Sequence, residues 1–568
     1  MSMLREFIRR LSRPGPSGTP IAPRERWVDG HRVVEDLGHQ IFTLTLRTTT
    51  SHGSSLLGGH GGEPLPAPTL TAVAPDQFVG GATLAEKARR FDQRLLASIE
   101  RVAQAGAGGF AGRNVLLRGL ARAIAGTVKP DDASLALMTA ARLGGAGLPE
   151  PFATVAQSRA QAALKDGSIP PATGVFTNSR ELETAHRQCT LLEAPPKGRD
   201  GIARLKEILA TDQEARATYE RLELLRARVE NPSSAPVLIT TPREAVDPVP
   251  LFSPRLRLAE SVTRRLLDAS APEDPHTRFE ALLRRLRATA ITPKAESGWH
   301  DWLAWSLEPL AKPESMKESA RLRLADSYRA SLLEIVRSAL DTPSAVRLGA
   351  PALDPSTPID PPRVTVRPNF RVEPLPTFYL RRGLGYRFLH QSLVEVLGTE
   401  TLATLVRELQ GGGSKGLRDE LDEMEALFLG AFAVACEDIG MKIDSAVEAD
   451  PAPFLRWMES SDPDLARDSR ELIPLQYDAA RGQIRSLLVL GWRERLLEIG
   501  YLAPPPASIF DEQERLVPEK RVRFEPQLVR VPTPVTLEVH VSAPIARGEL
   551  RELGDRAGSV QELVHRLG

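Results

Sequence analysis

The sequence predicts a mainly helical protein, a multi-helix assembly with a minor β component near its N-terminal arm and in its C-terminal segment. Between residues 83 and 500, apolar side chains recur every three or four positions over long stretches, which is the spacing of one helix face. Alternation with β-branched residues, which is typical of strands, is clearest in residues 27–47 and 521–542. The sequence shows no repeat of fixed period, so we do not expect a regular solenoid.

The charge balance and the cysteine content limit the classes of function. Lys and Arg together number 73, as do Asp and Glu, so the formal net charge is zero and gives no general attraction for nucleic acid or an anionic membrane. The two cysteines, Cys189 and Cys436, are too few for a disulfide framework and fit a reducing compartment. The apolar run at 427–436 is far shorter than the roughly 20 residues of a membrane-spanning helix. We therefore expect a cytoplasmic protein without a membrane span, whose partner would be another protein and not nucleic acid.

Residues 1–78 are predicted to form an arm. Its first 18 residues contain a short basic amphipathic helix, which would either dock on a membrane or partner surface or be a locally packed or frayed end. The dipeptide Asp29-Gly30 between alternating residues predicts a small strand pair in 27–47. Residues 48–75 are rich in Gly, Ser, Thr and Pro, as flexible linkers are.

The first helical region, 79–347, contains a pattern of possible metal ligands. Glu183, His186 and Cys189 follow one another at intervals of three residues, so they share one face of a predicted helix. A carboxylate-bridged di-metal bundle needs the Glu-x-x-His element twice, and the sequence has it once. We therefore expect no bound metal, and a metal site at these three residues is the alternative.

A tryptophan-rich segment, 296–340, is predicted to anchor the core. Three of the six tryptophans lie between positions 299 and 305, and Trp299 and Trp302 fall on one side of a predicted helix, opposite Asp301 and Glu308. Prolines at 309 and 313 predict a break, followed by a second helix that extends to residue 340.

A proline-rich connector, 348–372, separates this segment from a second helical region, 373–503. Arg382 lies in the middle of an apolar helix face there. Arginine is rarely buried without a partner, so we predict that it is buried beside Glu373, Glu308 or Asp301. Residues 476–499 are assigned to a further helix. The C-terminal segment, 504–568, is predicted to hold short strands and a final helix.

Two stretches resemble a known group of sequences. SGWHDWLAWSLEPL, which begins at Ser297, and FRVEPLPTFYLRRGLGYRFL, which begins at Phe370, are similar to an uncharacterised bacterial protein family with a domain of unknown function. The resemblance covers about the central third of the chain. It implies no activity, cofactor or site, only that the two stretches belong to one unit.

The sequence leaves two hypotheses for function. The glycine-rich motifs at 106–112 and 412–416 lack the strand-to-helix context of a nucleotide loop or a nucleophile elbow, so no cofactor is expected. The first hypothesis is a non-enzymatic helical scaffold or protein-interaction protein of the bacterial cytoplasm. The alternative is a hydrolase or other enzyme with an acid/base pocket between the helices at 297–310 and 376–397. Its candidate catalytic residues are Asp301, Glu308, Glu373, Tyr379, Arg382, Tyr386 and His390.

Overall fold

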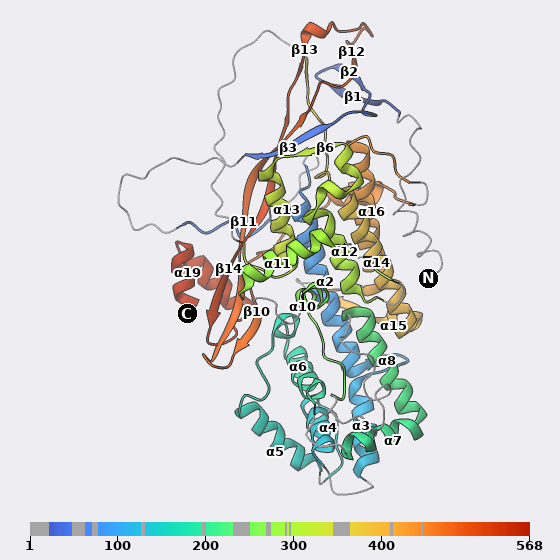
Figure 1. The fold of residues 1–568 in the computed structure, drawn as a ribbon, viewed down its shortest axis with the longest axis vertical. Coiled ribbons are helices and arrows are strands. Elements are labelled where there is room, and N and C mark those ends of the chain that lie inside the picture. The colour runs from blue at the N-terminus through green and yellow to red at the C-terminus, as the bar shows by residue number, and fades with distance from the viewer. Residues whose placement is uncertain are drawn as a thin grey trace.

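Helices fill most of the described chain, and a long ribbon of strands runs along one side of them (Figure 1). The computed structural model describes residues 22–47, 63–70, 78–125, 131–150, 152–195, 200–230, 250–267, 274–289, 292–294, 297–344, 364–408, 413–444 and 447–567. Within these ranges, no helix combines the length and the apolar character needed to cross a membrane.

Three helices that pack side by side form the centre of the core: α12 (Trp299–Ala311), α14 (Pro376–Leu397) and α16 (Leu417–Asp438). Every residue of α12 is buried, and Trp302 stacks on Phe388 of α14 with ring centroids 5.0 Å apart. A Cβ added at Gly383 would lie 3.0 Å from the Leu429 side chain, so glycine allows α14 and α16 to approach closely. The prediction that the tryptophan-rich segment anchors the core is confirmed.

Two further helices, α2 (Gly81–Ala105) and α13 (Asp326–Ala339), pack against this centre. Phe91 of α2 meets Tyr386 of α14 edge to face, with ring centroids 5.5 Å apart. The predicted helix from 313 to 340 begins later than expected. Its first part instead forms two 3-10 turns and a strand, namely η2 (Pro313–Ser315), η3 (Lys317–Ala320) and β6 (Leu322–Leu324).

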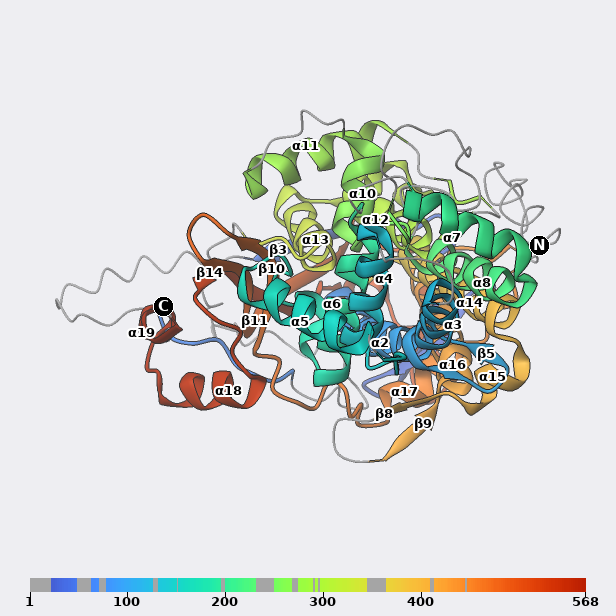
Figure 2. The ribbon, with the colours of Figure 1, turned by 90° about the horizontal axis from the view of Figure 1, so that it is seen from below.

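A second group of helices occupies the lower end of the molecule in Figure 1 and faces the viewer in Figure 2, which shows the molecule from below. Asp131 and Ser179 cap two of these helices by accepting hydrogen bonds from backbone N–H groups. The last helix of the group contacts both α12 and α14, which places its final residue, Glu230, beside the core. The group comprises α3 (Arg113–Ala125), α4 (Asp132–Leu143), α5 (Phe152–Lys165), η1 (Gly174–Thr177), α6 (Arg180–Glu193), α7 (Asp200–Thr211) and α8 (Gln213–Glu230).

Shorter helices cover the remaining sides of the core. Two of them pack on α12, and the last two lie at the C-terminal end beside the strand ribbon (Figure 1). They are α10 (Leu258–Leu266), α11 (Pro275–Ala288), α15 (Thr399–Thr404), α17 (Ala452–Met458), α18 (Arg547–Arg556) and α19 (Val560–Leu567).

The main sheet is built on one long strand, β11 (Gln483–Tyr501). On one edge β11 pairs antiparallel with β10 (Glu471–Asp478) and with β3 (Phe42–Arg47), and on the other edge with β14 (Gln527–Val541). Strand β6 pairs in parallel with β3. A bulge at Gly491 interrupts the β11–β14 ladder, where Trp492 exchanges backbone hydrogen bonds with Ala67.

Small sheets complete the fold. A tight turn at Asp29 and Gly30, whose φ angles are 46° and 75°, joins β1 (Arg24–Val28) to β2 (His31–Glu35), which confirms the predicted strand pair. β12 (Ala507–Phe510) pairs with β2. The other small sheets are β7 (Val364–Val366) with β13 (Val522–Phe524), β4 (Gly106–Ala107) with β5 (Phe110–Ala111), and β8 (Val406–Glu408) with β9 (Ser414–Gly416).

The predicted fold class, mainly α with a minor β component, is wrong. The structure is 53% helical and 18% strand, with several multi-strand sheets, and is therefore mixed α/β. The main error is at 476–499, where the predicted helix is a strand hairpin that pairs with β3 and β14. Residues 42–47, assigned to the arm, belong to the same sheet as β11. The domain boundaries themselves stay a prediction.

The bulge at Gly491 provides a test of the sheet. Replacing Gly491 by alanine is expected to lower the free energy of unfolding by roughly 1–3 kcal/mol, because φ is 142° and an added Cβ would lie 2.3 Å from the Ala67 carbonyl oxygen. Chemical denaturation measures this change. Gly119→Ala in α3 is the control, since an added Cβ there meets no atom within 4 Å. Equal stability of the two variants would contradict the described bulge.

Candidate functional site

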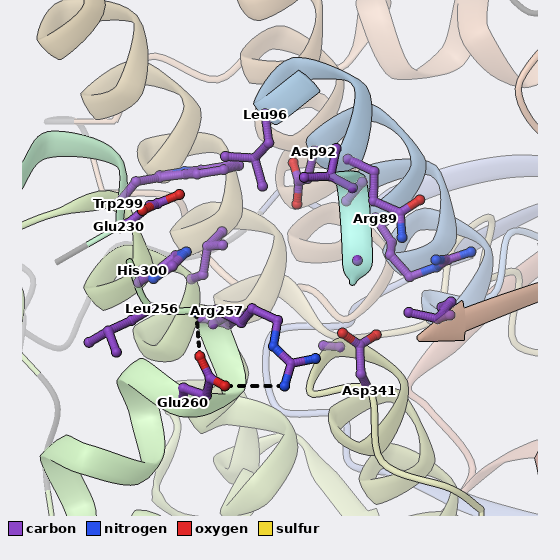
Figure 3. A pocket seen from close by; sticks show the side chains of 18 of the residues that line it. Arg89, Asp92, Leu96, Glu230, Leu256, Arg257, Glu260, Trp299, His300 and Asp341 are labelled. Carbon is purple, nitrogen blue, oxygen red and sulfur yellow. Dashed lines mark hydrogen bonds and ion pairs between the residues drawn. The ribbon is translucent and has the colours of Figure 1, made fainter. Parts of the chain in front are cut away.

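A cavity of about 330 Å³ lies between α2, α12 and α13 (Figure 3). Its other walls come from η1, from residues 255–260 at the start of α10, from α6, α14 and β10, and from the end of α8. This volume is at the small end of the roughly 300–1,000 Å³ that is usual for ligand sites. Much of the wall is apolar, with Leu96, Leu256, Leu303, Leu307, Ile335 and Phe378 among the lining residues.

Arg382 of α14 lies at one wall of the cavity and is only 8% exposed. It forms an ion pair with Asp92 of α2, and its Nη2 donates a hydrogen bond to Tyr386 Oη at 3.1 Å. The Tyr386 hydroxyl in turn donates to Asp92 Oδ1 at 2.9 Å. The prediction that Arg382 is buried beside a carboxylate is confirmed. The predicted partners are wrong, because Glu373, Glu308 and Asp301 all bind other groups.

Glu230, the last residue of α8, contributes a carboxyl group to the wall of the cavity. Its Oε2 is buried and has no hydrogen-bond partner in the described chain. Burial raises the pKa of Glu230 to about 7, and the nearby Arg226 and Arg255 oppose this only in part. Figure 3 shows the carboxyl group beside the Trp299 ring. At neutral pH this group is therefore near the midpoint of its titration.

A buried charge network explains why Glu230 lacks an arginine. Arg226 and Arg255 both donate to Glu193, at 2.5 and 2.6 Å. Arg113 pairs with Glu100, and Glu223 accepts a hydrogen bond from Ser253 Oγ at 2.5 Å and lies 3.7 Å from Arg226. Three arginines therefore face four glutamates, and Glu230 is the one without an ion pair within the network.

His300 lies close to Glu230 in Figure 3 and is 4% exposed. Burial lowers the pKa of its imidazole to about 4, while a hydrogen bond to the Glu230 backbone opposes the shift. The ring is therefore neutral at neutral pH. Its Nδ1 is buried without a hydrogen-bond partner in the described chain, so this corner of the cavity presents two acceptors.

The opposite side of the cavity carries Arg89, Arg257 and Asp341 (Figure 3). Arg89 donates to Glu86 through Nε and Nη2, at 2.8 and 3.0 Å. Burial raises the pKa of Asp341, although the two arginines oppose the shift. This side therefore also presents a carboxyl group with a weakened preference for the charged form.

Of the seven predicted catalytic residues, the structure places only Arg382 in the wall of this cavity. The predicted pocket between helices 297–310 and 376–397 is largely filled by their own packing, since Trp302 stacks on Phe388 there. Tyr386 is hydrogen-bonded to Arg382 and Asp92 at this wall, and the remaining candidates bind partners elsewhere. Asp301 pairs with Arg265, Glu308 with Arg381 and Lys312, and His390 with Asp422. The Glu373 carboxylate accepts hydrogen bonds from the Tyr328 hydroxyl and the Gly81 N–H, and the Glu373 backbone carbonyl accepts one from the Tyr379 hydroxyl.

The three predicted metal ligands also have separate surroundings. Glu183 pairs with Arg187, and His186 Nε2 lies 3.1 Å from the Pro170 carbonyl oxygen. Burial raises the pKa of the Cys189 thiol to about 11, which disfavours the thiolate that metals bind. Within the described ranges, no three His, Cys, Asp or Glu side chains are grouped to hold a metal ion.

Sequence reasoning missed Glu230, His300, Asp92 and Asp341. His300 lies between two residues that the helix pattern did identify, but a single histidine in an apolar helix carries no signal for a site. Glu230 ends a helix that is rich in exposed Glu and Arg, so its burial depends on contacts with α12 that the local pattern does not contain.

The pH dependence of stability tests the surroundings of Glu230. The folded state binds the Glu230 proton more tightly than the unfolded state does. The contribution of this proton to the free energy of unfolding is therefore fully present below the unfolded pKa of 4.5 and is lost as the pH rises through about 7. Glutamine resembles the protonated group, so Glu230→Gln should gain up to about 3 kcal/mol over the native chain near pH 8 and little near pH 5. Denaturant titrations at the two pH values measure this difference. Glu181→Gln, at a side chain 74% exposed, should show no such change, and a pH-independent effect of Glu230→Gln would contradict the assignment.

No protein-family model, no curated protein and no solved structure matches the chain. The resemblance of the stretches at Ser297 and Phe370 to an uncharacterised bacterial family is therefore still an interpretation of the sequence alone.

Proposed function

We propose that the protein binds a small organic cation with an apolar body in the cavity between α2, α12 and α13. The observation that supports this most is Glu230, a carboxyl group with a buried oxygen that has no hydrogen-bond partner in the described chain. A buried carboxyl group either takes up a proton, as the raised pKa of Glu230 indicates, or is stabilised in its charged form by a positive charge beside it. The arginines of the network are already paired with other glutamates, so the protonated nitrogen of a ligand would supply this charge.

The groups around Glu230 suit a protonated amine. The face of an aromatic ring such as that of Trp299 attracts cations, and the neutral His300 Nδ1 can accept one of the amine hydrogens. The apolar side chains that line the rest of the cavity would surround a hydrocarbon body. An ammonium group on a small apolar frame therefore matches both the charge and the lining.

An anionic ligand is a weaker match. Arg255 Nη1 is also buried without a hydrogen-bond partner in the described chain and could donate to an anion. However, an anion there would add to a network that already has more carboxylates than arginines, and Glu193 and Glu230 would repel it. Amine and acid ligands of the same shape therefore separate the two possibilities.

A second candidate function is a proton-transfer enzyme that uses the same cavity. The pKa of Glu230 is raised to about 7 and that of His300 is lowered to about 4, and opposite shifts of neighbouring groups are typical of acid/base sites. A carboxyl group near its titration midpoint can both accept and donate a proton. Product analysis after incubation with bound amines would distinguish turnover from binding. The hypothesis of a helical scaffold or protein-interaction protein concerns outer surfaces and stays a prediction.

Calorimetric titration with three compounds of one shape tests the proposal: phenethylamine, 2-phenylethanol and phenylacetate. The amine should bind tightest, and Glu230→Gln should weaken it about tenfold to a hundredfold, the effect of one charge-assisted hydrogen bond. Binding near pH 6.5 should also release protons, because an ammonium group lowers the pKa of the partly protonated Glu230. Repeating the titration in buffers of different ionisation enthalpy measures this release.

Glu181→Gln again provides the control, since its exposed carboxyl group is 74% accessible and lies outside the cavity lining. It should leave amine binding unchanged. Tighter binding of the acid than of the amine, or no binding of any of the three compounds, would contradict the proposal.

A further inference from the structure

Asp341 occupies a backbone position that favours glycine. It directly follows α13 and Leu340 with φ of 49°, and its N–H and that of Thr342 donate to the carbonyl groups of Ser338 and Arg337, at 3.3 and 2.9 Å. This is the Schellman arrangement that closes a helix, in which the residue of positive φ is usually glycine. A side chain other than glycine costs about 1 kcal/mol there, so the aspartate makes this end of the helix less stable than glycine would.

The charge of Asp341 is also unfavourable to the fold. A carboxylate at the C-terminal end of a helix faces the negative end of the helix dipole. The two arginines whose charges lower its pKa are paired with other carboxylates: Arg89 with Glu86 and Glu471, and Arg257 with Glu260. The Asp341 carboxyl group forms no hydrogen bond or ion pair with the residues that the structure describes, and the residue lines the cavity.

The other side of the same cavity supplies the second observation. His300, 4% exposed, has a buried Nδ1 without a partner in the described chain, and Glu230 has a buried oxygen in the same condition. Figure 3 shows these two residues and Asp341 on opposite sides of the cavity. Apolar side chains of α12 and α13, including Leu303, Leu307 and Ile335, line the space between them.

We infer that the ligand is a small diamine or polyamine, with one ammonium group at Glu230 and His300 and a second at Asp341. The inference rests on the proposed binding of an organic cation and adds its class. The methylene chain between two ammonium groups would lie along the apolar walls. A ligand with a second ammonium group explains what a ligand with one would not, namely why an aspartate occupies the strained position at the end of α13.

Calorimetry on the full-length protein tests the inference with linear diamines of about three to eight carbons, because the length of the diamine must match the distance between the two carboxyl groups. For each length, the alkylamine and the amino alcohol serve as matched probes with one ammonium group. The best diamine is expected to bind at least about tenfold tighter than either of these. The amino alcohol shows whether a second hydrogen-bond donor suffices without a second charge.

Substitutions at Asp341 then separate the two ends of the ligand. Asp341→Asn should reduce diamine binding to that of the alkylamine and leave alkylamine binding unchanged, whereas Glu230→Gln should weaken both. Asp341→Gly should lose the same affinity while its melting temperature stays equal or rises, since glycine relieves the backbone strain. Asp326→Asn, at a side chain 99% exposed on α13, should change neither diamine binding nor alkylamine binding.

The outcomes distinguish this inference from the proposed function. If neither amines nor diamines bind, both fail. If the alkylamine or the amino alcohol binds as tightly as the best diamine, the cavity binds a cation but the diamine class is overturned. The class is also overturned if Asp341→Asn weakens diamine and alkylamine equally. A selective loss of diamine binding in both Asp341 variants supports it.

Discussion

The pairing of buried arginine and carboxylate side chains fixes how the helices of this protein meet. Arg382 joins α14 to Asp92 of α2, and Arg381 of the same helix binds Glu308 of α12 at 2.5 Å. Breaking a buried pair by removing one partner costs roughly 3–5 kcal/mol, because a charge is then left in a medium that cannot solvate it. Each pair therefore allows essentially one relative placement of its two helices, and apolar packing of the tryptophan helix completes the fit.

The cavity between α2, α12 and α13 differs from the rest of the core, because two of its carboxyl groups form no ion pair with the described residues. Glu230 and Asp341 come from the ends of two helices, α8 and α13, where the chain can turn a side chain inward without disturbing the helix. Their environments weaken the charged form, as the raised pKa values of both groups indicate. A site that must bind a cation and release it benefits from such groups, since a carboxylate already neutralised by arginine would attract the ligand little.

The parts of the fold that follow from local sequence were predictable, and those that depend on distant partners were not. Burial of Trp299, Trp302 and Arg382 followed from helical periodicity. Asp92, the partner of Arg382, lies 290 positions away, so no local pattern connects them. Strand β11 was predicted as a helix because it is buried on both faces over much of its length and lacks the alternation of a half-exposed strand. The candidate site combines residues from many elements that are far apart in the sequence, so no local pattern could reveal it.

The order of strands in the main sheet has a consequence for synthesis of the chain. β3 lies in the first tenth of the sequence, but its antiparallel partner β11 begins only at Gln483. At translation rates of roughly 5–20 residues per second, β3 waits on the order of a minute for that partner. β6, which pairs with β3 in parallel, emerges earlier and has only three residues. During this interval the polar backbone edge of β3 is open to pairing with other nascent chains, which makes the ribosome-bound state the stage at which a chaperone would matter most.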